Sequence, residues 1–353
     1  YAAPPTVELF AGGGITSANG PVTAAQTNTY QGNLNNPTDS VASTYSPNTT
    51  VTYTLSSTRN SSRYSSANGA STNNPDLMFG GTVTNGSTVV TPATTYNALN
   101  GIGSPTNSNF AATVQNAPSS CSNGSNCSSG TTGGIDINSN YGSGMFAATK
   151  GLFAANLPTN GRHKIGSITI TFNRAVTNPI LQVAGLGGTA ASDLGFSAEF
   201  DLVNNTSLNN NVVMSRLAGS KELTVAGTRI SNNATTITAN TGAGGASGSV
   251  YLQGRRITSL TFDVYLRGDG NGTTWDASNT VAGDRFFFGV SSIEADNDLS
   301  ITKTQRAGTT DTFVGTQLDV IQGSTVQYRL VLANSTTSAV SGATYSDSVP
   351  SAI

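Results

Sequence analysis

The pattern of apolar and polar residues becomes regular after Ile165, where apolar side chains recur at every second position in short runs. Because successive side chains of a β-strand point to opposite faces, such a run predicts a strand that buries one face. Three runs show the alternation, with apolar positions at Ile168, Ile170 and Phe172; at Phe196, Ala198, Phe200 and Leu202; and at Leu260, Phe262, Val264 and Leu266. No segment keeps a 3.6-residue period for more than two turns, so we predict an all-β protein.

The connections between these runs favour two packed sheets. Glycine-rich turns occupy residues 184–188 and 241–245, and strands do not alternate with helical patterns, so an antiparallel sandwich is expected. We expect the first strand, near residues 7–10, to pair with the last, near residues 286–293, and so to close the domain. The prediction is a large jelly-roll-like antiparallel sandwich that forms a head domain over residues 1–295.

The first 160 residues are rich in Asn, Ser, Thr and Gly and carry only isolated strand candidates, at residues 6–10, 51–55 and 82–90. The stretches 56–74 and 104–140 have the composition of disordered segments, but loops of this length inside a domain are often functional surfaces. We favour ordered loops because apolar anchors follow them, at Met145, Phe146, Leu152 and Phe153.

The C-terminal residues carry the most specific motif. Asp298-Leu-Ser-Ile-Thr-Lys-Thr304 is followed by Gly323-Ser-Thr-Val-Gln-Tyr-Arg-Leu-Val-Leu-Ala-Asn334. This pair resembles the conserved repeat domain of bacterial surface proteins, the family known as domain of unknown function eleven. The resemblance covers about one sixth of the chain. It implies that residues 296–353 are the N-terminal half of an immunoglobulin-like sandwich, and that the protein is displayed on a cell surface as the outer module of a stalk.

A second resemblance lies in the central part of the chain. Residues 157–172 and 176–188 are similar to the large N-terminal module that often precedes conserved repeat domains in secreted bacterial proteins. This similarity implies adhesion or filament building and names no ligand.

Composition agrees with a secreted, turn-rich β protein. Charged residues make up 10% of the chain, against about 25% in an ordinary soluble domain. The net charge is −2 and the longest basic cluster is Arg255-Arg256, which argues against a nucleic-acid partner. No run of about 18 apolar residues is present, so no membrane insertion is expected. The first five residues, Tyr1 to Pro5, resemble what remains after removal of a signal peptide, and the C-terminal module lacks its remaining strands, so we expect a secreted fragment of a longer protein.

The two cysteines predict a local disulfide. Cys121 and Cys127 lie in a loop of Ser, Asn and Gly, where an exposed pair in an oxidising compartment would be joined. Two reduced thiols are the alternative. A zinc site is disfavoured because His163 is the only histidine of the chain.

Calcium is the cofactor that the sequence suggests. Asp269, Asn271 and Asp276 follow a predicted strand in a glycine-rich turn, and Asp284 could add an oxygen from across the loop. The alternative is a plain turn in which these side chains cap their own backbone.

A second calcium candidate lies at the domain junction, where Glu294, Asp296 and Asp298 place three carboxylates on one face of an extended chain. The alternative there is a solvated acidic hinge.

Ligand-binding candidates lie in the same glycine-rich loop. Arg267-Gly268-Asp269 is the tripeptide of integrin ligands, although a turn-rich chain produces it easily by chance. Trp275, the only tryptophan, is either an exposed platform for a sugar ring or a plug at the end of the sandwich. Phenylalanines at 286, 287 and 288 require that at least one ring be covered from outside its sheet.

Catalytic signals are weak. His163 has no acidic neighbour in sequence to orient it, no G-x-S-x-G motif occurs, and no carboxylate pair for glycoside hydrolysis stands in an apolar context. Thr235-Thr-Ile-Thr238 suggests a threonine ladder of the kind that binds ice, but no regular T-x-T repeat persists along the chain.

The function predicted from the sequence is therefore non-enzymatic: an adhesive head on an immunoglobulin-like stalk, with a host, glycan or abiotic surface as its partner. One alternative is a self-assembling filament subunit. In that case the apolar stripe of Val326, Tyr328, Leu330 and Leu332 would be covered by a strand from another copy. A carbohydrate-active hydrolase is the other alternative.

Overall fold

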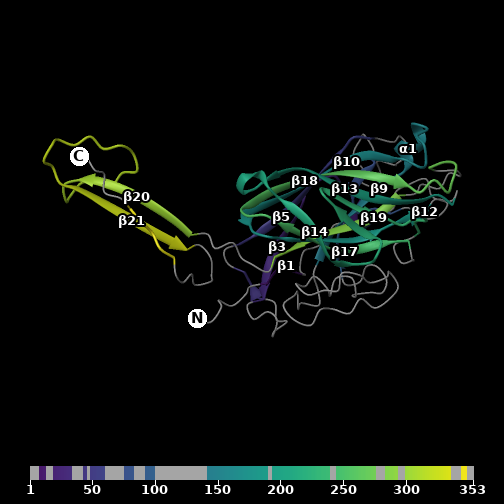
Figure 1. Ribbon diagram of the computed structural model, residues 1–353, viewed down its shortest axis with the longest axis horizontal. Helices are drawn as coiled ribbons and strands as arrows, with labels where there is room; N and C mark the ends of the chain where they lie inside the picture. The colour runs from purple at the N-terminus through teal and green to yellow at the C-terminus, as the bar shows by residue number, and fades with distance from the viewer. Residues whose placement is uncertain are drawn as a thin grey trace. The chain divides into compact units, whose positions relative to one another are not determined.

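The computed structural model describes residues 8–12, 19–33, 43–45, 48–59, 75–82, 92–99, 141–189, 193–238, 244–275, 283–292, 299–334 and 343–347. The chain divides into compact units, of which the larger is Pro5–Ala295 and the other contains Asp296–Ile353. Nearly all regular structure in these ranges is β-strand (Figure 1), which confirms the predicted fold class.

The larger sheet of Pro5–Ala295 contains ten strands among the described residues, all antiparallel to their neighbours, in the order β1-β3-β5-β10-β18-β13-β16-β15. Strand β4 pairs with β3, and β12 pairs with β13. The bounds are β1 (Glu8–Ala11), β3 (Gln26–Asn33), β4 (Ser43–Thr44), β5 (Thr50–Ser57), β10 (Arg162–Val176), β12 (Gly188–Thr189), β13 (Gly195–Thr206), β15 (Leu223–Ala226), β16 (Arg229–Asn232) and β18 (Ile257–Gly268).

The smaller sheet has the order β14-β17-β11-β19-β9-β6, with β8 beside β9, over the same described ranges. Its bounds are β6 (Leu77–Phe79), β8 (Tyr96–Ala98), β9 (Tyr141–Ala148), β11 (Ile180–Leu186), β14 (Val213–Gly219), β17 (Ala246–Gln253) and β19 (Gly283–Ser291). A short ladder joins β2 (Asn19–Gly20) to β7 (Ala93–Thr94). One α-helix, α1 (Lys150–Ala154), and one 3-10 turn, Leu208–Asn210, complete the described elements of this unit.

Consecutive strands pass back and forth between the two sheets. From β9 to β19 the chain enters the larger sheet at β10, β12–β13, β15–β16 and β18, and returns to the smaller sheet at β11, β14, β17 and β19. This alternation is the connectivity of a jelly-roll-like sandwich. The expected pairing of the first and last strands is present as a two-bond bridge: Leu9 N donates to Ser292 O at 2.6 Å, and Ser292 N donates to Leu9 O at 2.8 Å.

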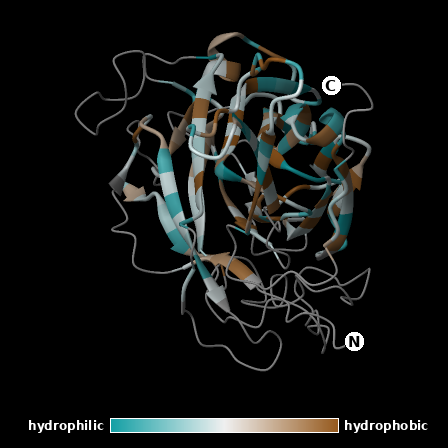
Figure 2. Cartoon of the chain, turned by 90° about the vertical axis from the view of Figure 1, so that its left-hand side faces the viewer, coloured by the Kyte–Doolittle hydropathy of each residue, from teal (hydrophilic) through white to brown (hydrophobic). Residues whose placement is uncertain are grey.

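The core lies between the sheets and is built from the alternating runs that the sequence shows. The apolar members of all three runs are buried. Figure 2 shows brown bands that alternate with pale or teal ones along strands of the chain. Phe200 packs against Phe286 and Phe288 with ring centroids 5.0 and 4.6 Å apart, and Phe262 lies 6.1 Å from Phe288. Burial of each such ring contributes about 2 kcal/mol.

The outer side of the smaller sheet is also covered in places. Phe287 points away from the main core and is buried in a separate cluster with Leu99 and Ala184, so the cover that the sequence required is provided by the segment after β8. The predicted anchors before and within α1 behave differently from one another. Leu152 is fully buried, whereas Phe153 is 42% exposed.

The C-terminal unit contains a β-hairpin. Strands β20 (Leu299–Ala307) and β21 (Val326–Asn334) pair antiparallel, with Lys303 opposite Leu330, so both predicted strands are confirmed. Along the other edge of β20, Gln305 forms an isolated bridge with Val314. No helix in the described ranges has the length and apolar character needed to cross a membrane.

Candidate functional site

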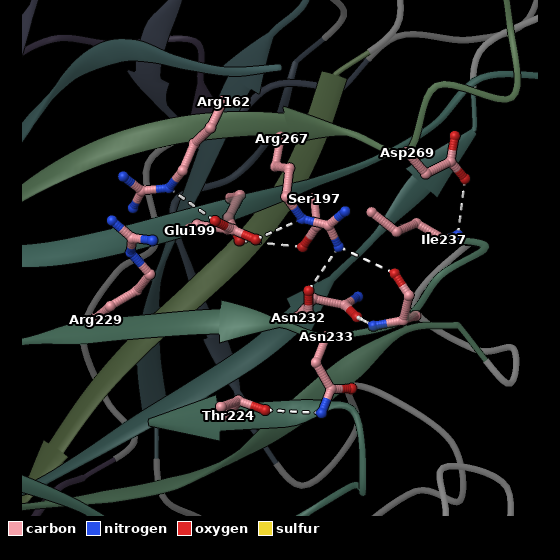
Figure 3. Close-up of polar contacts among 12 residues, drawn as sticks. Arg162, Ser197, Glu199, Thr224, Arg229, Asn232, Asn233, Ile237, Arg267 and Asp269 are labelled. Atoms are coloured by element: carbon pink, nitrogen blue, oxygen red, sulfur yellow. Dashed lines mark hydrogen bonds and ion pairs between the residues drawn. The ribbon is translucent and has the colours of Figure 1, made fainter. Parts of the chain in front are cut away.

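The outward face of the larger sheet carries a cluster of charged residues, here termed the charge network: Arg162, Glu199, Asp201, Arg229 and Arg267. Glu199 lies at its centre on β13, and its side chain is 3% exposed. One carboxylate oxygen accepts from Arg162 Nε at 2.8 Å, and the other accepts from Arg267 Nε at 2.7 Å (Figure 3). Antiparallel pairing of β13 with β18, and of β18 with β10, brings the three residues together from distant parts of the chain.

Asp201, the next outward residue of β13, is the second carboxylate of the network. It accepts two hydrogen bonds from Arg162, at 2.8 and 2.9 Å, and one from Arg229 Nε at 3.0 Å. Partial burial raises the pKa of Asp201, but the hydrogen bonds and charges of the two arginines outweigh it and hold the pKa below its usual value. Arg162 also stacks over the ring of Tyr265, with its guanidinium carbon 3.6 Å from the ring centroid.

Arg267 connects the network to the loop after β16. Its Nη2 donates to Asn232 O at 2.7 Å and to Ala234 O at 3.1 Å. Asn232 in turn donates to Gly244 O at 2.7 Å. Asn233 donates to Thr224 Oγ1 at 2.8 Å (Figure 3). Each carboxylate of the network is therefore bonded by two arginines, and Arg267 fixes the neighbouring loop.

Asp269, which the sequence assigned to a calcium site, is surrounded by N–H donors. Its carboxylate accepts from the backbone N–H of Ile237 at 2.9 Å, of Gly195 at 3.2 Å and of Asn271 at 3.0 Å, and from Asn271 Nδ2 at 2.8 Å. These donors occupy the lone pairs that a cation would use. The arrangement is that of the alternative, a turn in which Asp and Asn side chains cap backbone groups.

The Arg267-Gly268-Asp269 tripeptide is part of this structural framework. Arg267 and Asp269 both bond within the sandwich, and Gly268 is buried at the end of β18. A Cβ atom at Gly268 would lie 2.0 Å from Thr159 O, so the backbone here is packed against another chain segment. The tripeptide does not form a projecting loop.

Trp275 plugs the end of the sandwich and is not an exposed platform for a sugar ring. It is 1% exposed, and its Nε1 donates to Leu157 O at 3.1 Å and to Pro158 O at 3.2 Å. His163 packs edge-on against it, with ring centroids 5.7 Å apart, and contacts Pro158 O through Nε2. No face of the indole is open to a sugar ring.

Asp284 is buried at 1% exposure and joins the two sheets. Its Oδ2 accepts from Ala198 N on β13 at 2.6 Å, and both oxygens contact Gly187 N, at 3.1 and 3.2 Å. Burial raises the pKa of Asp284 to about 7, although these N–H donors act in the opposite direction. The structure thus gives Asp284 and Asp269 separate sets of backbone partners.

The other metal and disulfide candidates, which are Asp276, Glu294, Asp296, Asp298, Cys121 and Cys127, lie outside the described residues. Within the described ranges, no group of three or more His, Cys, Asp or Glu side chains is placed to hold a metal ion.

The hairpin presents the apolar stripe that the sequence assigned to assembly. Tyr328 is 39% exposed and Leu332 57% exposed, while Val326 and Leu330 are half-buried. Register places Ile301, which is 54% exposed, opposite Leu332, so β20 extends the stripe. Additional members of the face are Leu299, Lys303 and Gln305; the Lys303 ammonium lies over the Tyr328 ring and bonds Asp347 at 2.8 Å.

Sequence reasoning missed the charge network, although one signal for it was present. In the run Phe196 to Leu202, the positions between the apolar residues are Ser197, Glu199 and Asp201, and two acids at alternate positions of a buried strand require cationic partners. Which arginines supply them depends on the strand order, and single-sequence patterns do not contain that order.

Comparison with known proteins found no matching family model, no similar curated protein and no similar solved structure.

Proposed function

We propose that this chain is a non-enzymatic, secreted bacterial surface protein in which the Pro5–Ala295 sandwich is an adhesive head and the C-terminal unit is the first spacer of a stalk. The observation that carries the proposal is the separation into a large self-contained unit followed by a hairpin that has the motif of surface repeat domains. The head encloses its own core, and its long antiparallel ladders hold one outer face in a fixed shape. Such a rigid face is suited to contact with another surface.

The carboxylates of the larger sheet favour this function over hydrolysis. A glycoside hydrolase needs an acid with a raised pKa and a second carboxylate at a substrate cleft. Glu199 and Asp201 are instead bonded by arginines, Asp201 has a lowered pKa, and Asp263 bonds Lys164 Nζ at 2.7 Å. Asp284 has a raised pKa, but it is 1% exposed and bonded to backbone N–H groups between the sheets.

Adhesion is tested directly by coating beads with the 353-residue chain and measuring their retention, under flow, on glycan arrays, bacterial and host cells, and clean mineral or polymer surfaces. We expect retention on at least one surface class and its loss when free protein is added in excess. Retention equal to that of albumin-coated beads on every surface would overturn the proposal.

A second candidate function is a filament subunit, and the hairpin favours it. The face formed by Ile301, Tyr328 and Leu332 is exposed, and an exposed apolar face of this kind marks an interaction surface. A strand or sheet from another copy would bury this face.

Electron microscopy of the secreted material, with and without a chelator, tests assembly and the junction calcium together. Leu332→Lys should abolish fibres, whereas Val331→Lys, at a residue of similar exposure on the opposite face of β21, should not. Fibres that persist in the Leu332 variant would exclude this face as the joint, and loss of fibres in chelator would implicate Glu294, Asp296 and Asp298.

A further inference from the structure

The outward positions next to the charge network are filled with hydroxyl side chains. On β5, Thr50, Thr52, Thr54 and Ser56 occupy four successive outward positions, while Val51 and Tyr53 between them are buried. The same pattern continues on β10, where Ser167, Thr169 and Thr171 alternate with buried Ile168, Ile170 and Phe172.

Strand register aligns these hydroxyls into rows across the sheet, here termed the hydroxyl rows. The longest row crosses five adjacent strands and the next crosses three. Shorter pairs flank them. The first row is Thr27, Thr52, Thr171, Ser259 and Thr206; the second is Thr54, Thr169 and Thr261; the flanking pairs are Thr29 with Thr50 and Ser56 with Ser167.

The rows form a two-dimensional array. Neighbouring strands lie about 4.8 Å apart and alternate residues of one strand about 6.7 Å apart, so the first row is roughly 19 Å long. Contacts within the rows show this closeness: the hydroxyls of Thr27 and Thr52 are 2.8 Å apart, and those of Thr169 and Thr261 are 3.2 Å apart. Thr27, Thr54 and Thr171 are exposed, whereas Thr52, Thr169 and Thr261 are half-buried between their neighbours.

The array is stiff and uncharged. Threonine is β-branched, so its hydroxyl and methyl groups hold few orientations, and each hydroxyl offers one donor and two acceptor sites. No charged residue occupies the first or second row on β3, β5, β10 and β18. Charge begins at Asp263, beside Ser167, where Ser167 Oγ donates to the carboxylate at 2.8 Å.

Two features decide which partner fits. Sugar rings in solution are usually held by stacking on aromatic rings, and none of the members of these rows is aromatic. Tyr265, the outward aromatic of β18, is covered by Arg162, while Tyr53 on β5 and Tyr30 on β3 point into the core. A rigid, neutral, periodic array of hydroxyls instead matches a partner that is itself rigid and periodic and whose every surface oxygen donates and accepts hydrogen bonds.

We propose that the hydroxyl rows bind ice. This inference rests on the proposed adhesive function and identifies the head's abiotic surface as crystalline water. The structure also explains why the sequence shows no regular T-x-T repeat. The T-x-T repeat does not persist along the chain because strands β3, β5 and β10, which carry its parts, are separated in sequence and become adjacent only in the sheet.

The test is partitioning of the fluorescently labelled 353-residue chain into a slowly grown ice crystal, with the protein in the ice and in the remaining liquid measured separately. We expect enrichment in the ice for the unaltered chain, and exclusion of Thr171→Lys, which places a charge in the middle of the first row. Thr228→Lys is the matched control, because Thr228 is exposed in the turn between β15 and β16, outside the rows. Should Thr171→Lys unfold, as judged by circular dichroism, Thr54→Lys in the second row replaces it.

Exclusion of the unaltered chain from ice overturns the inference, and equal incorporation of the two lysine variants overturns the assignment to the rows. A parallel arm measures cosedimentation with microcrystalline cellulose and chitin. If the chain binds cellulose or chitin and is not incorporated into ice, the partner of the hydroxyl rows is a neutral polysaccharide and the proposed adhesive function is retained. Failure in both arms, together with fibres in the electron microscope, means that the adhesive proposal fails as well.

Discussion

Replacement of Glu199 by Gln tests whether the charge network holds the larger sheet together. The carboxylate is almost completely buried and lies between two guanidinium groups at 2.8 and 2.7 Å. The Gln side chain has the same shape as that of Glu, but its amide group has only one acceptor oxygen. Its NH2 group would face one of the two arginines, which is also a hydrogen-bond donor. Arg267 would then retain only the carbonyls of Asn232 and Ala234 as partners.

The magnitude follows from burial. Breaking a buried ion pair by removing one partner costs about 3–5 kcal/mol. The arginine side chains are 17% and 25% exposed, and Arg162 keeps Asp201, so we expect the lower end, about 3 kcal/mol. Asp201→Asn is the matched control: that carboxylate is 17% exposed, and its loss should cost about 1 kcal/mol.

The assay is urea unfolding followed by tryptophan fluorescence. Trp275 is the only tryptophan and is buried in the sandwich, so the emission reports on this unit and not on the hairpin. Salt provides an additional check, since 1 M NaCl should weaken the effect at the more exposed Asp201 and leave most of the effect at Glu199. A Glu199→Gln cost equal to or smaller than that of Asp201→Asn would refute the argument that burial sets the strength of this network.

Two other predictions concern the buried ends of the sandwich. Gly268→Ala places a Cβ atom 2.0 Å from Thr159 O and 2.9 Å from Trp275 Cη2. It should therefore destabilise the unit by about 1–3 kcal/mol and shift tryptophan emission to the red. Unchanged emission would contradict the packing described here. Burial raises the pKa of Asp284 from 3.8 to about 7. Between these two values the folded state keeps a proton that the unfolded state loses, so the free energy of unfolding should fall as the pH rises from about 4 to 7. The contribution of this group is at most about 4 kcal/mol. Asp284→Asn should remove that slope, so the difference in melting temperature between the unaltered chain and the variant should change between pH 4 and 7. Parallel profiles would exclude this role of Asp284.

The strands of the sandwich core could be predicted from the sequence, but which strands lie next to one another in the sheets could not. Phe200, Phe262 and Leu266 alternate with polar residues, and alternation is a local property, so their burial could be predicted. The first third was harder, because β3 and β5 carry Thr, Ser, Asn or Gln at most positions, and β9 contains glycines that hide its period.

Everything that depends on strand order was beyond single-sequence reasoning. The contact between Glu199 and Arg162 spans 37 residues, and that between Thr27 and Thr52 joins strands whose outward residues look merely polar. Trp275 is a case in which the sequence offered the correct alternative but could not select it. Both of its alternatives were stated from the sequence, but the choice depended on the carbonyls of Leu157 and Pro158, which lie more than one hundred residues away.

The position of β19 determines how the sandwich responds to a pulling force. This strand precedes the C-terminal unit in the chain, and it is hydrogen-bonded along both edges, to β11 on one side and β9 on the other. Ser292, just past its end, adds two bonds to Leu9. Tension applied through the following residues loads these bonds in shear, parallel to the strand, so many must break together before β19 can leave. A strand at a sheet edge, by contrast, can be peeled away one bond at a time. The exit strand is therefore also the mechanical anchor of the domain, and a tether attached at this end can transmit drag without unzipping the sheet.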